Sequence, residues 1–415
     1  MTAAPSQGDL VVGRYELGEV IGEGGFAKVF SATDTRTGES VAVKYPNYEG
    51  SQNDRDIVTA YFEKEAETLE AIRAVGGHPN VMSLLDVADD DGTSVLVVEL
   101  VDGYELDDAI RRTGPLDDVD EVRQIGIDLC DAMSFLHENE IVYRDLKPDN
   151  VMITHRGGTV TPVLIDFNTA TGFTAGAEAG DDAADQTTIV GPYKPREVAE
   201  ADQTEMRQGP WSDVYSVGKI LLYLLKGTVP RKDGVDPRDF GADCEPYLAE
   251  IVEMATQTDY EDRYRNATAM KRVLEARDPT PPPAATVRYT QEDESYTVYP
   301  GDTIGRRYAE GPRSSIVVED DGEYISTVQV QFDTDADGEW FIRDRSLNGT
   351  YVQTGSGWQR VLSEEGRERL EACGEDATDR EGKVPPELYG LRDGDLIALV
   401  HPSYGVTFEF ESDQA

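Results

Sequence analysis

A run of prolines divides this chain of 415 residues into two parts of different character. Four of the five residues 279–283 are proline, which cannot continue a helix and which favours an extended, semi-rigid spacer. Before this run, segments 219–226 and 248–256 carry apolar residues at helical spacing. After it, segments 327–332 and 406–410 alternate β-branched or aromatic residues with polar ones, as antiparallel strands do. The sequence therefore predicts a first domain containing long helices, a linker, and an all-β second domain.

The composition indicates a folded and strongly acidic protein. Asp and Glu number 82 against 38 Lys and Arg, a formal net charge of −44, while 39 % of the residues are hydrophobic. Such a charge repels phosphate at long range, so we expect no nucleic-acid partner. Only 10 of the 38 basic residues are Lys, which favours a haloarchaeal origin and surroundings of high salt. A merely acidic mesophilic protein is the alternative.

Neither disulfide bonds nor membrane spans are indicated by the sequence. The three cysteines, Cys130, Cys244 and Cys373, lie far apart and form no CxxC pair, so no disulfide framework or zinc site is expected. The first ten residues do not resemble a secretory signal. The longest apolar runs, such as 220–225, are far shorter than the roughly 18 residues that cross a bilayer. We therefore expect a cytoplasmic protein with no membrane partner.

Three residues in the first third of the chain suit the binding of nucleotide phosphates. Gly22 and Gly24 allow a hairpin backbone to approach phosphate oxygens because they carry no Cβ, although two such glycines more often mark only a turn. Fifteen residues after Val29, an apolar strand ends in Lys44, which is placed to hold α- and β-phosphates. Glu65, in a helical segment, is placed to pair with Lys44; taken alone it would be one more solvated acid.

A short loop in the middle of the first domain is the most informative stretch. The sequence YRDLKPDN places Asp145, Lys147 and Asn150 together, and Asp166 follows an apolar strand sixteen residues later. Asn150 and Asp166 supply the oxygen ligands that Mg²⁺ prefers. Asp145 is suited to orient a substrate hydroxyl and accept its proton, and Lys147 to neutralise charge on a transferred phosphoryl group. Chance assembly of this ordered set is negligible.

With these motifs, residues 15–276 resemble the eukaryotic-type protein kinases. The resemblance also rests on HPNV ending at Val81, PRE ending at Glu197, DVYSVG beginning at Asp213, and Arg263, which is placed to pair with Glu197. It implies a two-lobed kinase fold, ATP and Mg²⁺ as cofactors, and in-line phosphoryl transfer to protein Ser or Thr. The lysine in LKPDN resembles the serine/threonine branch of the family.

The resemblance also implies which residues contact ATP, in the glycine-rich loop, the strand of Lys44 and the hinge. They are Ile21, Gly22, Glu23, Gly24, Gly25, Phe26, Ala27, Val29, Ala42, Lys44, Glu99 and Val101. Four residues depart from the family's usual pattern without removing a chemical group: Ala27, Tyr143, Asn168 and Arg196. Asn168 replaces a glycine and, as the residue that best tolerates left-handed geometry, is expected to preserve the turn.

The resemblance suggests how the kinase domain is regulated. Arg144 precedes Asp145, and in this family such an arginine commonly binds a phosphate on the activation segment. Thr187 and Thr188 lie where the family is often phosphorylated, so we predict autophosphorylation there. The alternative is that both are ordinary loop residues.

In the second domain, Arg306, Ser326 and Asn348 each follow a strand-like run, where loops project from a β-sandwich. By order and spacing, residues 293–412 resemble a forkhead-associated (FHA) domain. This implies that Arg306 and Ser326 bind the phosphate of phosphothreonine, while Asn348 holds the backbone of the bound peptide.

Three residues depart from the FHA pattern: Gln329 replaces a structural His, Thr327 replaces a frequent phosphate-binding Arg, and Leu347 replaces a frequent Thr or Ser. Arg307 is a candidate for the missing cation, or else a surface charge. The alternative is a sandwich that keeps its loops for stability and binds through another surface.

The predicted fold class is α+β, a two-lobed kinase fold followed by an all-β FHA-type sandwich. We expect a tail over 1–14, the kinase domain over 15–276, a linker over 277–292, and the FHA-like domain over 293–412 with a helix-prone insertion at about 363–388. The predicted function is a serine/threonine kinase whose second domain binds phosphothreonine peptides in cis or in trans. The alternative is a non-catalytic, nucleotide-binding adaptor that docks phosphoproteins; a kinase acting on small molecules is disfavoured.

Overall fold

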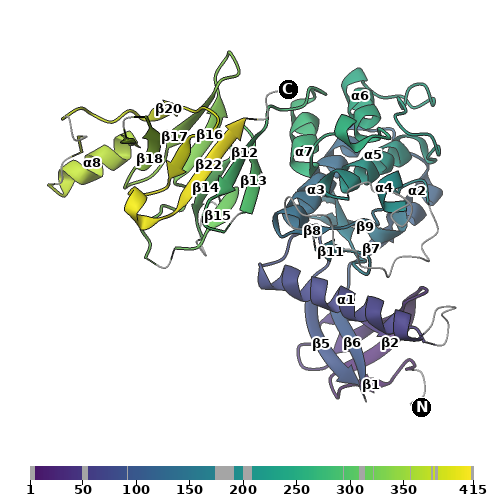
Figure 1. Cartoon of the computed structure of the whole chain (residues 1–415). Helices are drawn as coiled ribbons and strands as arrows, with labels where there is room; N and C mark the ends of the chain where they lie inside the picture. The colour runs from purple at the N-terminus through teal and green to yellow at the C-terminus, as the bar shows by residue number, and fades with distance from the viewer. Residues whose placement is uncertain are drawn as a thin grey trace. The chain divides into compact units, whose positions relative to one another are not determined.

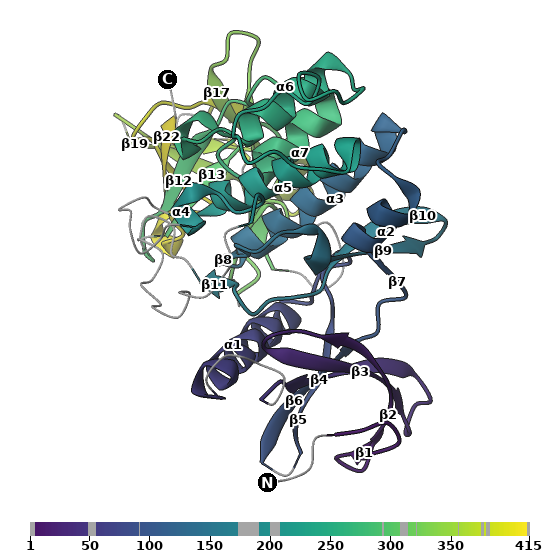
Figure 2. The ribbon, with the colours of Figure 1, turned by 90° about the vertical axis from the view of Figure 1, so that its right-hand side faces the viewer.

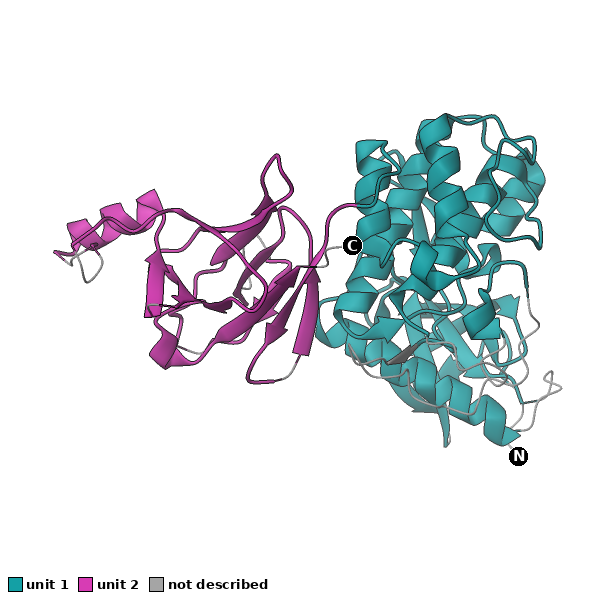
Figure 3. Ribbon diagram, turned by 45° about the horizontal axis from the view of Figure 1, so that its top comes forward, with its two compact units in different colours: residues 1–281 teal, residues 282–415 magenta. Residues whose placement is uncertain are grey.

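The chain forms two compact units, residues 1–281 and 282–415 (Figure 3), which we describe separately. The computed structural model describes residues 5–48, 55–90, 92–172, 191–199, 208–292, 294–307, 314–320, 322–355, 357–374, 377–378 and 382–412. Mixed helices and sheets in the first unit and a sandwich of two sheets in the second confirm the predicted fold class.

The smaller lobe of the first unit is an antiparallel sheet with one helix packed on it (Figure 2). Its strands, in the order β1-β2-β3-β4-β6-β5, are β1 (Leu10–Val11), β2 (Tyr15–Glu23), β3 (Ala27–Asp34), β4 (Ser40–Pro46), β6 (Thr93–Glu99) and β5 (Leu84–Asp90). Helix α1 (Arg55–Ala74) buries Val58, Phe62, Leu69 and Ile72 at helical spacing. This packing fixes the helix that carries Glu65 against the strand that carries Lys44.

The larger lobe is mainly helical and surrounds helix α5 (Pro210–Lys226), whose residues 212–225 are all buried. The other helices are α2 (Leu106–Thr113), α3 (Val119–Glu138), α4 (Arg196–Ala199), α6 (Pro246–Ala255) and α7 (Ala267–Ala276). Short strands line the side that faces the smaller lobe (Figure 1): β7 (Gly103–Glu105), β8 (Ile141–Val142), β9 (Val151–Arg156), β10 (Thr159–Leu164) and β11 (Thr171–Gly172). A Cβ on Gly218 would lie 2.9 Å from the Cβ of Ala255, so a larger residue would separate α5 from α6.

The second unit is a sandwich of two sheets with a single apolar core between them. One sheet has the order β13 (Glu294–Val298), β12 (Ala285–Tyr289), β22 (Thr407–Ser412), β21 (Leu396–Ala398), β18 (Thr350–Thr354) and β19 (Gly357–Val361). The other has the order β15 (Ile316–Val318), β14 (Thr303–Arg306), β16 (Val330–Thr334), β17 (Trp340–Asp344) and β20 (Leu388–Gly390). Buried residues alternate along β16 and β17, as the sequence pattern predicts.

The structure corrects two predicted boundaries. Strand β12 lies inside the predicted linker 277–292 and pairs with β13 and β22, so it belongs to the sandwich. Strand β1 lies inside the predicted tail 1–14; Val11 is buried and pairs with Tyr15. Strand β1 has two residues and pairs with the start of β2, whereas β12 pairs both with the adjacent β13 and with the distant β22. Helix α8 (Glu364–Ala372) lies within the predicted insertion. Among the helices that the structure describes, none has the length and apolarity needed to cross a membrane.

Candidate active site and phosphate-binding face

The smaller lobe of the first unit contains a buried ion pair between Lys44 and Glu65. Lys44 lies on β4, in register with Val29 on one neighbouring strand and Leu96 on the other, and its Nζ contacts Glu65 Oε1 of helix α1. Both side chains are almost fully buried. Burial opposes the charge on the lysine, but the carboxylates of Glu65 and Asp166 outweigh it and raise the pKa of Lys44. The pair that the spacing predicts is therefore formed, and its lysine is charged.

The loop after β8 holds Asp145 in a single orientation. Lys147 Nζ donates to Asp145 Oδ2 at 2.7 Å, and Asn150 Nδ2 donates to the same oxygen at 2.9 Å and to the Asp145 carbonyl at 2.8 Å. From helix α5, the buried carboxylate of Asp213 accepts hydrogen bonds from the backbone N–H groups of Tyr143 and Arg144. Arg144 adopts a left-handed backbone with φ of 65°, a strained geometry that these bonds help to hold.

Lys194 is a second cation on Asp145 that the sequence reasoning missed. Its Nζ lies 3.2 Å from Asp145 Oδ1, and its side chain is only 8 % exposed. Each oxygen of the Asp145 carboxylate therefore has its own ammonium partner, Lys147 on one and Lys194 on the other. The available signal was composition: Lys194 is one of ten lysines in a chain of 415 residues, and it lies just before Pro195.

The segments that carry Asn150 and Asp166, the predicted metal ligands, are adjacent in the structure. Because Asn150 Nδ2 is committed to Asp145, the amide oxygen at the other side of the group is directed away from that carboxylate. The backbone of Ile165, next to Asp166, donates to the Asn150 carbonyl at 3.1 Å, which joins the two segments. Within the described ranges, no group of three or more His, Cys, Asp or Glu is arranged to hold a metal. Two protein oxygen ligands with water and phosphate suit Mg²⁺, so these residues fit it.

The residues beside Asp166 differ in one respect from the sequence prediction. Asn168 is absent from the described residues that have a positive φ, so this turn does not use left-handed geometry there. Instead, the Asn168 N–H donates to Asp166 Oδ1 at 3.3 Å. Phe167 is fully buried and packs edge-on against Tyr143, with ring centroids 5.2 Å apart. Tyr143, the residue in place of the usual His, therefore serves as packing for this segment.

The residues predicted to contact ATP surround one side of the cleft. Ile21, Gly22, Glu23, Gly24, Gly25, Phe26, Ala27 and Val29 form the β2–β3 hairpin, Ala42 and Lys44 lie on β4, and Glu99 and Val101 lie at the end of β6 and just beyond it. The tip of the hairpin is closed by a hydrogen bond from the Gly24 N–H to the Ala27 carbonyl, 2.9 Å. The Glu99 side chain is bound by Arg156 at 2.6 Å, which leaves the backbone as the hinge's recognition element.

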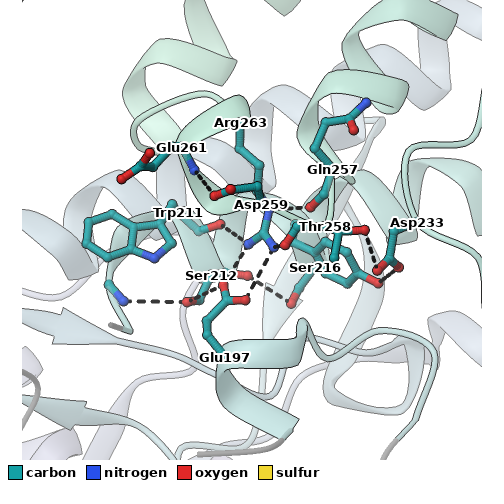
Figure 4. Close-up of polar contacts among 12 residues, drawn as sticks. Glu197, Trp211, Ser212, Ser216, Asp233, Gln257, Thr258, Asp259, Glu261 and Arg263 are labelled. Atoms are coloured by element: carbon teal, nitrogen blue, oxygen red, sulfur yellow. Dashed lines mark hydrogen bonds and ion pairs between the residues drawn. The ribbon is translucent and has the colours of Figure 1, made fainter. Parts of the chain in front are cut away.

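The end of the activation segment is anchored by a fully buried ion pair (Figure 4). Arg263 contacts both carboxylate oxygens of Glu197, at 2.6 and 3.3 Å, as the sequence predicts. Ser212 Oγ also donates to Glu197, and the remaining guanidinium N–H groups bind carbonyls of the surrounding chain. The predicted phosphorylation sites, Thr187 and Thr188, lie outside the described residues.

In the second unit, the three residues predicted to bind phosphothreonine lie on adjoining loops. The Arg306 N–H donates to the Ser326 carbonyl at 3.0 Å, and Ser326 Oγ accepts from the Leu347 N–H at 3.3 Å. Asn348 Nδ2 donates to the Tyr324 carbonyl at 2.8 Å. The structure therefore brings Arg306, Ser326 and Asn348 together at one end of the sandwich.

Gln329, which replaces a structural His, connects two of these loops through its side-chain amide. It is fully buried; its Oε1 accepts from the Ser326 N–H at 2.9 Å, and its Nε2 donates to the Gly349 carbonyl at 3.1 Å and to Thr350 Oγ1 at 3.2 Å. One amide thus links the loop of Ser326 to the loop of Asn348. Arg307, considered as a compensating cation, instead pairs with Glu319 on the surface at 2.7 Å.

Comparison with known proteins agrees with both units. A family model described as "Protein kinase domain" matches residues 15–277, and one described as "FHA domain" matches residues 303–371. The chain is similar to serine/threonine-protein kinase PknB of Mycolicibacterium smegmatis, 29 % identical over 297 residues that cover 66 % of this chain and 45 % of the relative. It is also similar to CBL-interacting protein kinase 9 of Oryza sativa subsp. japonica, 36 % identical over 231 residues that cover 55 % of this chain and 47 % of the relative. The chain spans less than half the length of these relatives.

Proposed function

Because the chain belongs to the protein kinase family, we propose that it is an ATP-dependent serine/threonine protein kinase whose FHA domain binds phosphothreonine. The observation that carries the first part is the assembled cleft. The Lys44–Glu65 pair is formed, and Asp145 is held by Lys147 and Asn150. A nucleotide-binding adaptor without activity would not need a carboxylate oriented by three polar groups, which are Lys147, Asn150 and Lys194.

In the proposed reaction, the substrate hydroxyl oxygen attacks the γ-phosphorus of ATP while the bond to the β–γ bridging oxygen breaks. The hydroxyl proton passes to the Asp145 carboxylate, and ADP leaves. Lys44 holds the α- and β-phosphates, and Lys147 neutralises charge on the group in transfer. Asn150 and Asp166 would hold Mg²⁺, which would supply neutralisation of charge on the phosphate oxygens. The chain contributes mainly position and charge, since phosphoryl transfer needs little covalent help from the protein.

Radiolabelled ATP tests this proposal on the full chain, with the wild type and the Asp145→Asn variant compared in high-salt buffer. We expect the wild type to label itself or a generic acceptor such as myelin basic protein, and Asp145→Asn to lose at least 100-fold in rate. Binding of a fluorescent ATP analogue by both proteins, without label transfer by either, would instead establish the adaptor function.

Phosphothreonine binding by the second unit is supported by the convergence of Arg306, Ser326 and Asn348 and by the Gln329 brace. Arginine and hydroxyl groups recognise phosphate through short, directed hydrogen bonds. Fluorescence polarisation with matched phosphothreonine and threonine peptides tests it. We expect binding only of the phosphorylated peptide, with a loss of at least tenfold in Ser326→Ala and Arg306→Ala.

Two further proposals concern the surroundings of the protein and its regulation, and each rests on a different feature of the sequence. The net charge of −44 and the scarcity of lysine support a cytoplasmic protein adapted to high salt, for which activity should rise with KCl concentration into the molar range. From the resemblance to protein kinases, we also propose autophosphorylation at Thr187 or Thr188, with Arg144 as the residue that binds the phosphate. A mass spectrum of ATP-treated protein with no phosphate in residues 166–197 would exclude it.

A further inference from the structure

Helix α8 is fixed to the end of the sandwich that carries the proposed phosphothreonine site (Figure 1). Ser363 caps the helix by accepting from the Gly366 N–H at 3.0 Å, and its hydroxyl donates to the Ser346 carbonyl at 2.8 Å. Leu370 packs with Leu362 and Ala377 in a small separate core. The charged insertion therefore has a defined place beside the loop of Asn348.

Two further contacts make this placement specific. A Cβ on Gly366 would lie 2.9 Å from the Ser346 carbonyl oxygen, so the helix approaches the loop as closely as a glycine allows. Arg367 pairs with Glu387 at 2.7 Å, which ties the helix to the segment that leads into β20. These contacts fix the position of the next turn of α8, which carries Arg369, relative to the loop of Asn348.

Arg369 is the side chain that this placement brings to Asn348. One of its guanidinium N–H groups donates to Asn348 Oδ1 at 2.8 Å, and the residue is exposed. Within the part of the chain that the structure describes, Arg369 forms no ion pair. This is notable in a chain with 82 acidic residues against 38 basic ones. A surface hollow that Arg369 does not line is formed by Glu364, Glu365 and Glu368 together with Arg343 and Arg345.

We propose that Arg369 is a specificity-determining residue that binds an acidic side chain close to the phosphothreonine of a bound peptide. The inference rests on the proposed phosphothreonine binding and adds a second anionic position to it. A peptide whose backbone reaches Asn348 passes beside the guanidinium, which has donors left for a carboxylate. In so acidic a molecule, a peptide carboxylate is repelled from most of the surface, so one exposed arginine at the site discriminates between sequences.

The competing explanation is that Arg369 only fixes the rotamer of Asn348. The two roles differ in a measurable way. If Arg369 only fixes the Asn348 rotamer, its removal weakens the binding of every phosphopeptide by the same factor. If Arg369 binds an anion, its removal weakens the binding only of peptides with an acid at the matching position.

The test uses the full chain in the Asp145→Asn background, treated with phosphatase so that its own phosphothreonine does not compete. Fluorescein-labelled peptides carry a central phosphothreonine in an Ala/Gly background, with one Asp or one Lys placed at each flanking position in turn. Fluorescence polarisation is measured for this parent protein and for its Arg369→Ala and Arg369→Glu variants. Arg392→Ala is the matched control, since it removes an exposed arginine from the loop after β20, at the other end of β17 from Asn348.

For at least one position we expect Asp to bind about three- to tenfold more tightly than Lys, a difference typical of a partly exposed charge pair. Arg369→Ala should remove this difference, Arg369→Glu should reverse it, and Arg392→Ala should keep it. An unchanged preference in Arg369→Ala, equal weakening of all peptides, or no preference in the parent protein would overturn the inference. If no phosphopeptide binds at all, the proposed function fails first and the inference fails with it.

Discussion

The two phosphate-handling regions of this molecule differ in how their charged groups are held. In the kinase cleft, the acidic groups are paired before any ligand arrives: Lys44 binds Glu65, and two lysines bind Asp145, with almost no exposure of these carboxylates. In the FHA unit, Arg306 lies 3.8 Å from an exposed Glu323, and Arg369 contacts only neutral groups among the described residues.

This difference matches the work proposed for each region. Catalysis depends on charges that are oriented in advance, because reorganisation during the reaction raises the barrier. Recognition of a phosphopeptide needs hydrogen-bond donors whose partners in the free protein bind weakly enough to be replaced by the phosphate. The contact between Arg306 and the Glu323 carboxylate is long, and its glutamate is exposed, so a phosphate can displace this carboxylate at little cost.

The comparison predicts its largest effect when a buried ion pair is broken and the loss of stability is compared with that of an exposed pair. Arg263→Ala leaves Glu197 charged and fully buried, so we expect a loss of about 3–5 kcal/mol in the unfolding free energy of the kinase unit. Arg307→Ala breaks an exposed pair of similar length in the FHA unit and should cost about 0–1 kcal/mol. Urea denaturation, followed by signals that separate the two units, measures both. Similar losses in the two variants would contradict the comparison.

The next largest effect is expected at Lys194. Lys194→Met removes the cation from Asp145 Oδ1 while Lys147 stays on Oδ2, so the carboxylate loses part of its fixed orientation. We expect kcat to fall about 30-fold, or about 2 kcal/mol in the activation free energy, with KM for ATP unchanged. Lys194→Arg should recover part of the rate. Lys226→Met serves as the control, because Lys226 is the last residue of α5 and, among the described residues, donates to the Gly241 carbonyl and not to Asp145. A rate for Lys194→Met equal to that of this control would show that Lys194 is dispensable.

A smaller effect is expected from the neutral brace of the FHA unit. Gln329→Ala leaves the Ser326 N–H and the Gly349 carbonyl without their buried partner, and the two loops lose the buried one of their links. We expect phosphothreonine-peptide binding to weaken about tenfold, or about 1.4 kcal/mol, by fluorescence polarisation. Gln353→Ala, on an exposed position of β18, should bind as the wild type does. Unchanged binding in Gln329→Ala would mean that the loops hold their positions independently.

The sequence predicted those parts of the sites that lie close together along the chain. Asp145, Lys147 and Asn150 fall within six residues, so their juxtaposition needs only one loop. Lys194 reaches the same carboxylate from almost fifty residues away, and only the folded lobe brings it there. Strand β12 lies in the predicted linker because it begins two residues after the prolines, and its pairing with β22 joins residues more than a hundred positions apart.

Strand pairing, and ion pairs such as Lys194–Asp145 that the family pattern does not include, therefore set the limit of sequence reasoning in this chain. The Glu197–Arg263 pair joins residues just as distant along the chain, and it was predicted through the resemblance to protein kinases. The substitution of Gln for His at 329 illustrates the same limit. From the sequence it counted as a departure, whereas the structure shows that its oxygen and its nitrogen serve two different loops. An amide carries one acceptor and two donors in fixed positions, and this suits a bridge between two backbones.

The smallest effect concerns a buried carboxylate that lacks a cation. Asp344 is 1 % exposed and accepts from Thr350, Ser346 and the Ser363 N–H, and burial raises its pKa despite these bonds. An acid with a raised pKa in the folded state binds its proton there before the unfolded chain does. The unfolding free energy of the FHA unit should therefore rise, relative to that of Asp344→Asn, as the pH falls from 7 toward 4. Denaturation of both proteins across this range measures the difference; a relative fall in the wild type would mean that hydrogen bonding, not burial, controls this carboxyl group.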